Sequence, residues 1–120
     1  MEKLKFRLDI LKNSEVIDEE IYNKVISLIE HLDKKWEITL TEENGAMFIT
    51  HLSMALKRIK QNENVNNIDK TVFEEVMVSD KLDKIEEIYE DIEKNIFIEK
   101  LPEEEKKYIL VNLLLLEEDK

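Results

Sequence analysis

The 120-residue chain contains no cysteine, one glycine and one proline. Without cysteine it can form no disulfide, no thiolate nucleophile and no cysteine-ligated zinc site. A single glycine excludes the glycine-rich loops that bind phosphates in nucleotide-binding proteins. With 39% charged and 42% hydrophobic residues and few helix breakers, the composition favours helices. We therefore predict an all-α fold in one domain spanning residues 1–120.

Positive charge and long hydrophobic runs are also scarce. The chain has 18 basic and 29 acidic residues, a net charge of −11. Such a surface repels phosphate backbones and anionic lipids, so we expect no direct contact with nucleic acid or membrane. The densest apolar run, residues 108–116, is interrupted by Asn112 and is too short to span a bilayer, and no apolar leader begins the chain. We expect a cytoplasmic protein that acts through other proteins.

Apolar residues recur at helical spacing in several segments, and capping residues indicate where these helices begin. Residues 37–40, 61–67 and 95–101 are expected to connect helices, and Asn44-Gly45 could delay the regular start of one of them. The segment after Ser79 places apolar residues on one helical face up to Ile96. The expected helix starts are near residue 1 and at Asp18, Thr41, Asp69, Ser79 and Pro102.

The final helix is apolar on almost every side. One small bundle cannot cover all of these side chains, so this helix lies either at the centre of the core or partly against a second copy of the chain. We therefore expect a homodimer.

One segment of the chain, residues 47–58, is a candidate functional site. At about 100° per residue, His51 shares a helical face with Phe48, Ala55 and Arg58. A neutral imidazole is a good nucleophile near pH 7, and Arg58 could pair with an added phosphoryl group. The alternative is a structural histidine with Arg58 in a surface salt bridge, which is the commoner meaning of such spacing. The second histidine, His31, is interpreted as a boundary residue of its helix.

Other chemistries lack the residues that they need. Neither histidine has a glutamate three residues before it, as a di-iron bundle requires. Ser53 and His51 point about 100° apart on a helix, too far for a nucleophile and its base. We predict no enzyme activity, no metal site and no cofactor.

The segment that contains His51 is partly repeated later in the chain. Residues 40–43 and 47–52 align without gaps on residues 101–104 and 108–113, with four identities. This alignment sets Asn112 opposite His51.

Two segments of the sequence resemble a known family, the PTS regulation domain (PRD) of bacterial sugar-utilisation regulators. Residues 48–52 with Ala55 and Arg58 resemble the first histidine motif of that family, and residues 102–109 resemble its second motif. The resemblance covers essentially the whole chain. It implies a compact bundle of about five helices that dimerises, and a histidine that receives phosphate from HPr or an enzyme II domain of the phosphotransferase system.

The chain departs from the family pattern in two respects. Asn112 stands where the second motif ends in histidine, which leaves His51 as the family-type phosphoacceptor. The 120 residues leave no room for an RNA-binding or helix-turn-helix effector, so we expect any output to pass through a separate regulatory or transport protein. Two interpretations stay open: a phospho-regulated signalling module, and a helical dimerisation or scaffold protein that kept the fold without phosphorylation.

Overall fold

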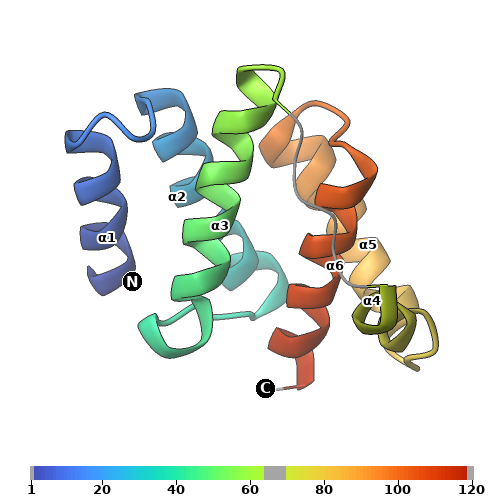
Figure 1. The fold of residues 1–120 in the computed structure, drawn as a ribbon. Coiled ribbons are helices and arrows are strands. Elements are labelled where there is room, and N and C mark those ends of the chain that lie inside the picture. The colour runs from blue at the N-terminus through green and yellow to red at the C-terminus, as the bar shows by residue number, and fades with distance from the viewer. Residues whose placement is uncertain (1, 64–69, 119–120) are drawn as a thin grey trace. The chain divides into compact units, whose positions relative to one another are not determined.

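The computed structural model describes residues 2–63 and 70–118, and within this part every regular element is helical (Figure 1). The prediction of an all-α fold is confirmed. The chain divides into two compact units, residues 1–64 and 65–120, which are taken in turn below. The predicted loop at 61–67 begins at Gln61, directly after α3 ends. Residues 64–67 of this loop and the predicted helix start at Asp69 lie outside the described residues.

The first unit contains three helices, α1 (Glu2–Asn13), α2 (Glu19–Trp36) and α3 (Glu42–Lys60). Successive helices run in opposite directions, so α1 and α3 run parallel (Figure 1). Each helix contacts the other two. Their apolar stripes form the core of the unit, in which the following residues are fully buried: Leu4, Leu8, Val25, Leu28, Leu32, Ile49 and Leu52.

Side chains cap both long helices of this unit where the sequence predicts. The carboxylate of Asp18 accepts a hydrogen bond from the Ile21 amide at 2.8 Å. Thr41 accepts one from the Asn44 amide, while the Asn44 side chain accepts one from the Thr41 amide at 2.7 Å, which completes a capping box. The expected delay at Asn44-Gly45 is therefore wrong, because Asn44 caps the helix and α3 begins at Glu42.

Gly45 has a packing role inside the helix. A Cβ atom at this position would lie 3.1 Å from the Cβ atom of Leu40, closer than ordinary van der Waals contact. Leu40 is 1% exposed, so the missing side chain lets the connection between α2 and α3 bury its leucine against the first turn of α3.

Replacing Asp18 by alanine is expected to lower the free energy of unfolding by about 1 kcal/mol, because the first turn of α2 loses its side-chain acceptor. The ion pair that Asp18 makes with Lys60 is half exposed and should add little. Urea denaturation checks this, with Glu30→Ala as the control, since Glu30 is an exposed residue in the middle of the same helix. Equal losses for the two variants would contradict the capping role.

The second unit contains α4 (Lys70–Met77), α5 (Leu82–Ile92) and α6 (Glu103–Glu118), with a π-helical turn, Glu93–Phe97, continuing α5. Helices α4 and α5 both pack on α6. Pro102 directly precedes α6, and its carbonyl accepts hydrogen bonds from the Glu105 and Lys106 amides. Most apolar residues of α6 are buried in the chain itself, namely Ile109, Leu110, Leu113, Leu114 and Leu116.

The π-helical turn corrects one detail of the predicted helix. The spacing in the sequence places Ile96 on the buried face, but Ile96 is only half-buried and Phe97 is 1% exposed. The amide of Ile98 donates to the carbonyl of Glu93 at 2.9 Å, a bond that spans five residues instead of four. One extra residue thus enters the turn and moves the buried position on by one. The connection begins at Ile98, three residues after the predicted Asn95.

The two units repeat one another in burial and in backbone conformation. Residues 48–53 and 109–114 have the same classes in order: two buried, two half-buried, two buried. Glu37 and Ile98, 61 residues apart, both end their helices in the left-handed region, with φ of 56° and 58°. Before the π-helical turn the offset is 60 residues, as shown by the buried pairs Val25 and Ile85, Leu28 and Ile88, Ile29 and Tyr89, and Leu32 and Ile92. The π-helical turn therefore holds the one residue by which the second unit is longer.

Candidate functional site

His51 lies at the edge of the buried stripe of α3. Phe48 and Ala55, one turn to either side on its face, are 2% and 0% exposed, whereas His51 and Arg58 are half-buried. The imidazole therefore rests on apolar side chains and still reaches the surface.

Its surroundings keep the imidazole neutral. Burial lowers the pKa of His51 below its ordinary value of 6.5, and the positive charge of Arg58, two turns along the helix, lowers it further. Both causes disfavour the protonated ring. At pH 7 the ring is therefore mainly in its neutral form, in which one nitrogen carries the lone pair of a nucleophile.

Replacing Arg58 by alanine should raise the pKa of His51, because one of the two causes of its depression is removed while burial remains. The shift is expected to be small, since Arg58 is half exposed and its charge is screened. An NMR titration of the imidazole Cε1–H signal, assigned with His51→Ala, measures it. Arg58→Lys keeps the charge and should leave the pKa near its wild-type value, and an unchanged pKa in Arg58→Ala would contradict this account.

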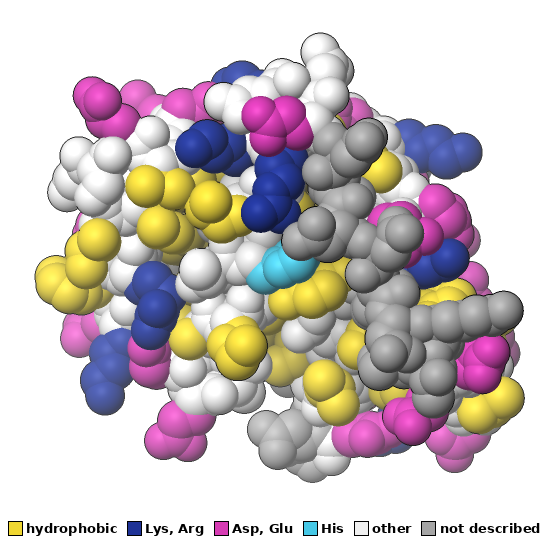
Figure 2. Space-filling model, viewed as in Figure 1, with side chains coloured by type: hydrophobic (Ala, Val, Ile, Leu, Met, Phe, Trp, Pro, Cys, Tyr) yellow, Lys and Arg dark blue, Asp and Glu magenta, His cyan; other side chains and the backbone are white. Residues whose placement is uncertain are grey.

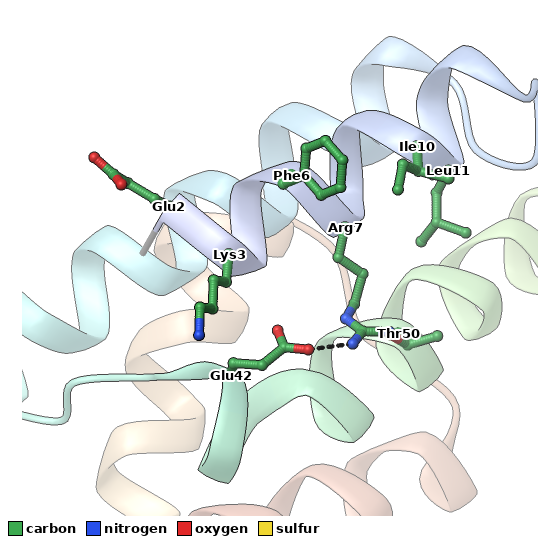
Figure 3. A pocket seen from close by; sticks show the side chains of 8 residues that line it. All are labelled: Glu2, Lys3, Phe6, Arg7, Ile10, Leu11, Glu42 and Thr50. Carbon is green, nitrogen blue, oxygen red and sulfur yellow. Dashed lines mark hydrogen bonds and ion pairs between the residues drawn. The ribbon is translucent and has the colours of Figure 1, made fainter.

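A second arginine reaches the same place from another helix. Arg7 of α1 lines, with Ala46, Met47, Thr50 and His51 of α3, a shallow depression of about 360 Å³. In Figure 3 its side chain extends from α1 towards α3 and ends between Glu42 and Thr50, where it forms an ion pair with Glu42. Arg7 was not among the site residues predicted from the sequence. The available signal was that the chain has only two arginines among its 18 basic residues, and both prove to lie near His51.

Three polar atoms around Arg7 are buried without a hydrogen-bond partner. They are the Nε of Arg7, the Oγ1 of Thr50 and the Oε2 of Glu42. Buried polar groups are normally paired, since leaving one unpaired costs about 1–3 kcal/mol. The first two are donors and line the depression that contains His51.

An apolar groove lies next to this depression, between α1 and α3 (Figure 3). It has a volume of about 510 Å³, and its lining includes Phe6, Ile10, Arg7 and Thr50. Phe6 and Ile10 are 65% and 50% exposed, and nearby Met47 is 86% exposed. Figure 2 shows hydrophobic side chains gathered over α1 and α3. Arg7 and Thr50 belong to both the groove and the depression.

The other residues singled out in the sequence lie elsewhere. Asn112 is half-buried in α6, where its side-chain amide donates to the Tyr108 carbonyl at 2.9 Å. His31 is half-buried in α2. The hydroxyl of Ser53, which is fully buried, donates to the Ile49 carbonyl of its own helix. Among residues 2–63 and 70–118, no three histidine or carboxylate side chains group as a metal site would require.

One family model matches the chain. The model of the PRD domain matches residues 24–115, which include α3, α4, α5 and most of α6. The chain is 27% identical over 107 residues to the uncharacterised protein YhfY of Escherichia coli (strain K12), covering 89% of this chain and 88% of that protein. No solved structure matches the chain significantly. In the described part of the chain no helix has the length and apolar character to cross a membrane. From the match of the family model over most of its length, the chain belongs to the PRD domain family.

Proposed function

We propose that the protein is a phospho-regulated signalling module in which His51 accepts a phosphoryl group from the sugar phosphotransferase system. The observation that carries this proposal is the setting of His51, which is neutral, partly exposed and within reach of positive charge. It lies inside the segment that matches the PRD model. The role is regulatory and not catalytic, as in the family that the sequence resembles.

The chemical step needs nothing beyond the donor. A ring nitrogen of His51 attacks phosphorus with its lone pair, a P–N bond forms, and the bond from phosphorus to the donor breaks, the donor keeping that electron pair. The donors are HPr or a sugar-specific enzyme II domain, which places the protein in the cytoplasm. The new group carries a charge of about −2, enough to change how α3 packs or what it binds.

The output passes through other proteins. With a net charge of −11 the chain is unsuited to phosphate backbones, so we propose that it acts on a separate regulatory or transport protein in sugar-responsive transcription, without contacting nucleic acid or membrane. The second candidate function, a dimerisation or scaffold protein without phosphorylation, is favoured by Asn112 in place of a second histidine.

Incubation with HPr, enzyme I and radiolabelled phosphoenolpyruvate separates the two candidates. A signalling module gains one acid-labile phosphoryl group per chain, stable in alkali as phosphohistidine is. A scaffold gains none. Repeating the reaction with the enzyme II domains of several sugar systems in place of HPr identifies the donor, and absence of label from every donor would reject the proposal.

We also propose that the working form is a homodimer. Phe6, Ile10 and Met47 leave apolar surface uncovered on the first unit, and Leu115 of α6 is 57% exposed. Light scattering is expected to give twice the mass of the 14.4 kDa chain at micromolar concentration. A monomer at that concentration would contradict the proposal.

A further inference from the structure

The depression beside His51 is lined by two hydrogen-bond donors that have no acceptor. The Nε–H of Arg7 and the hydroxyl of Thr50 are buried and unpaired, one on α1 and one on α3. Both line the same depression as His51. Donors left unpaired around a nucleophile are suited to an anionic group that arrives only after reaction, because they then satisfy its oxygens without displacing existing bonds.

The third unpaired atom, Oε2 of Glu42, indicates that the ion pair between Arg7 and Glu42 can rearrange. Arg7 is held by Glu42, in the first turn of α3, and the other carboxylate oxygen of Glu42 is buried without a partner. A carboxylate beside a phosphoryl dianion repels it. Arg7 forms a stronger pair with the dianion than with Glu42. A guanidinium can donate two parallel hydrogen bonds to phosphate oxygens, and the dianion has twice the charge of the carboxylate.

We infer that Arg7 and Thr50 form the binding site for the phosphoryl group on His51, and that Arg7 exchanges Glu42 for this group when His51 is phosphorylated. This inference rests on His51 as the phosphorylated residue in the proposed function. Because Arg7 also lines the groove beside Phe6 and Ile10, the exchange alters that groove. The surface that a partner meets on α1 therefore differs between the two forms of the protein.

The number of arginines makes the exchange directly observable. A ¹⁵N-labelled chain gives only two arginine Nε–H signals, from Arg7 and Arg58, which Arg7→Lys and Arg58→Lys assign. His31→Gln is used as the background, so that His51 is the one histidine available. Phosphorylation of His51 is expected to move the Arg7 signal downfield and to slow its exchange with water. An Arg7 signal that does not respond would overturn the inference.

A second measurement tests whether Arg7 touches the phosphoryl group. A ³¹P titration gives the pKa of the phosphoryl group on His51, which a neighbouring cation lowers. Arg7→Ala should raise that pKa by about 1, Arg7→Lys by less, and Thr50→Val should raise it slightly through the lost hydrogen bond. Lys3→Ala is the matched control, because Lys3 lies beside Glu42 in the groove but does not line the depression. Equal effects of Arg7→Ala and Lys3→Ala would overturn the assignment.

Two routes to the phosphorylated chain keep this test separate from the proposed function. One uses HPr, enzyme I and phosphoenolpyruvate. The other uses phosphoramidate, whose phosphoryl group passes to the imidazole nitrogen while ammonia leaves. If only phosphoramidate labels His51 and the Arg7 signal responds, the proposed function fails and the phosphoryl site stands. If phosphoramidate leaves His51 unmodified in the folded chain, the depression is closed to phosphate and the inference is overturned.

Discussion

A chain with His51 replaced by alanine is expected to take up no phosphoryl label from HPr, enzyme I and phosphoenolpyruvate. The loss should be complete, because Asn112, at the equivalent place in the second unit, offers an amide whose nitrogen lone pair is delocalised into its carbonyl. The same amide is already engaged, donating to the Tyr108 carbonyl. The measurement is label per chain after separation under alkaline conditions.

Two further variants make this result specific to His51. His31→Ala should retain full label, and far-UV circular dichroism should show that both alanine variants keep their helices. Asn112→His should raise the label from one towards two phosphoryl groups per chain, because the half-buried position in α6 matches that of His51 in α3. Full labelling of His51→Ala, with the group mapped to His31, would show that His51 is not the site.

Replacing Phe97 by alanine should cost about 3–5 kcal/mol of unfolding free energy, whereas Ile96→Ala should cost about 1 kcal/mol. Phe97 is 1% exposed and fills the core at the end of α5, while the neighbouring isoleucine is half-buried. The difference arises from the π-helical turn, which moves the buried position from residue 96 to residue 97. Urea denaturation followed by circular dichroism compares the two variants.

Each of these two variants is the control for the other in a test of the π-helical turn. An uninterrupted α-helix would bury Ile96 and expose Phe97, so the order of the two losses distinguishes the two backbones. If Ile96→Ala proved the more destabilising, the chain would not form the π-helical turn in solution. A loss of this size is a large part of the roughly 5–15 kcal/mol of stability typical of a domain, so the two variants are compared near 10 °C, where domains are close to their maximum stability.

The sequence predicts those parts of the fold that depend on local chemistry. The helix caps at Asp18 and Thr41 depend on one side chain and an amide three residues on, and both are found in place. The prediction that α3 starts late was wrong because Asn44-Gly45 was interpreted as a helix breaker, whereas the Asn44 side chain completes the cap of the helix. The π-helical turn escaped detection because apolar residues stand at both Ile96 and Phe97, so periodicity alone cannot choose between them.

In the candidate site, too, the residues that lie on one helix could be predicted from the sequence, and those brought together by packing could not. His51 and Arg58 belong to one helix, and their shared face follows from the helical period. Arg7 comes from α1, and which face α1 turns towards α3 depends on how the whole unit packs. The unpaired donors at Arg7 and Thr50 are equally inaccessible to sequence reasoning, because an unpaired atom is defined by its surroundings.

The repeated three-helix arrangement has a consequence for how the protein folds. In each unit the helices that contact one another are neighbours in the chain or separated by a single helix, so most contacts close short loops. Chains dominated by such local contacts cross a low entropic barrier and fold within microseconds to milliseconds. Each unit can then nucleate by itself as soon as its own helices have emerged during synthesis. Stopped-flow refolding should show a main phase in that range, and a main phase lasting seconds would contradict independent nucleation of the units.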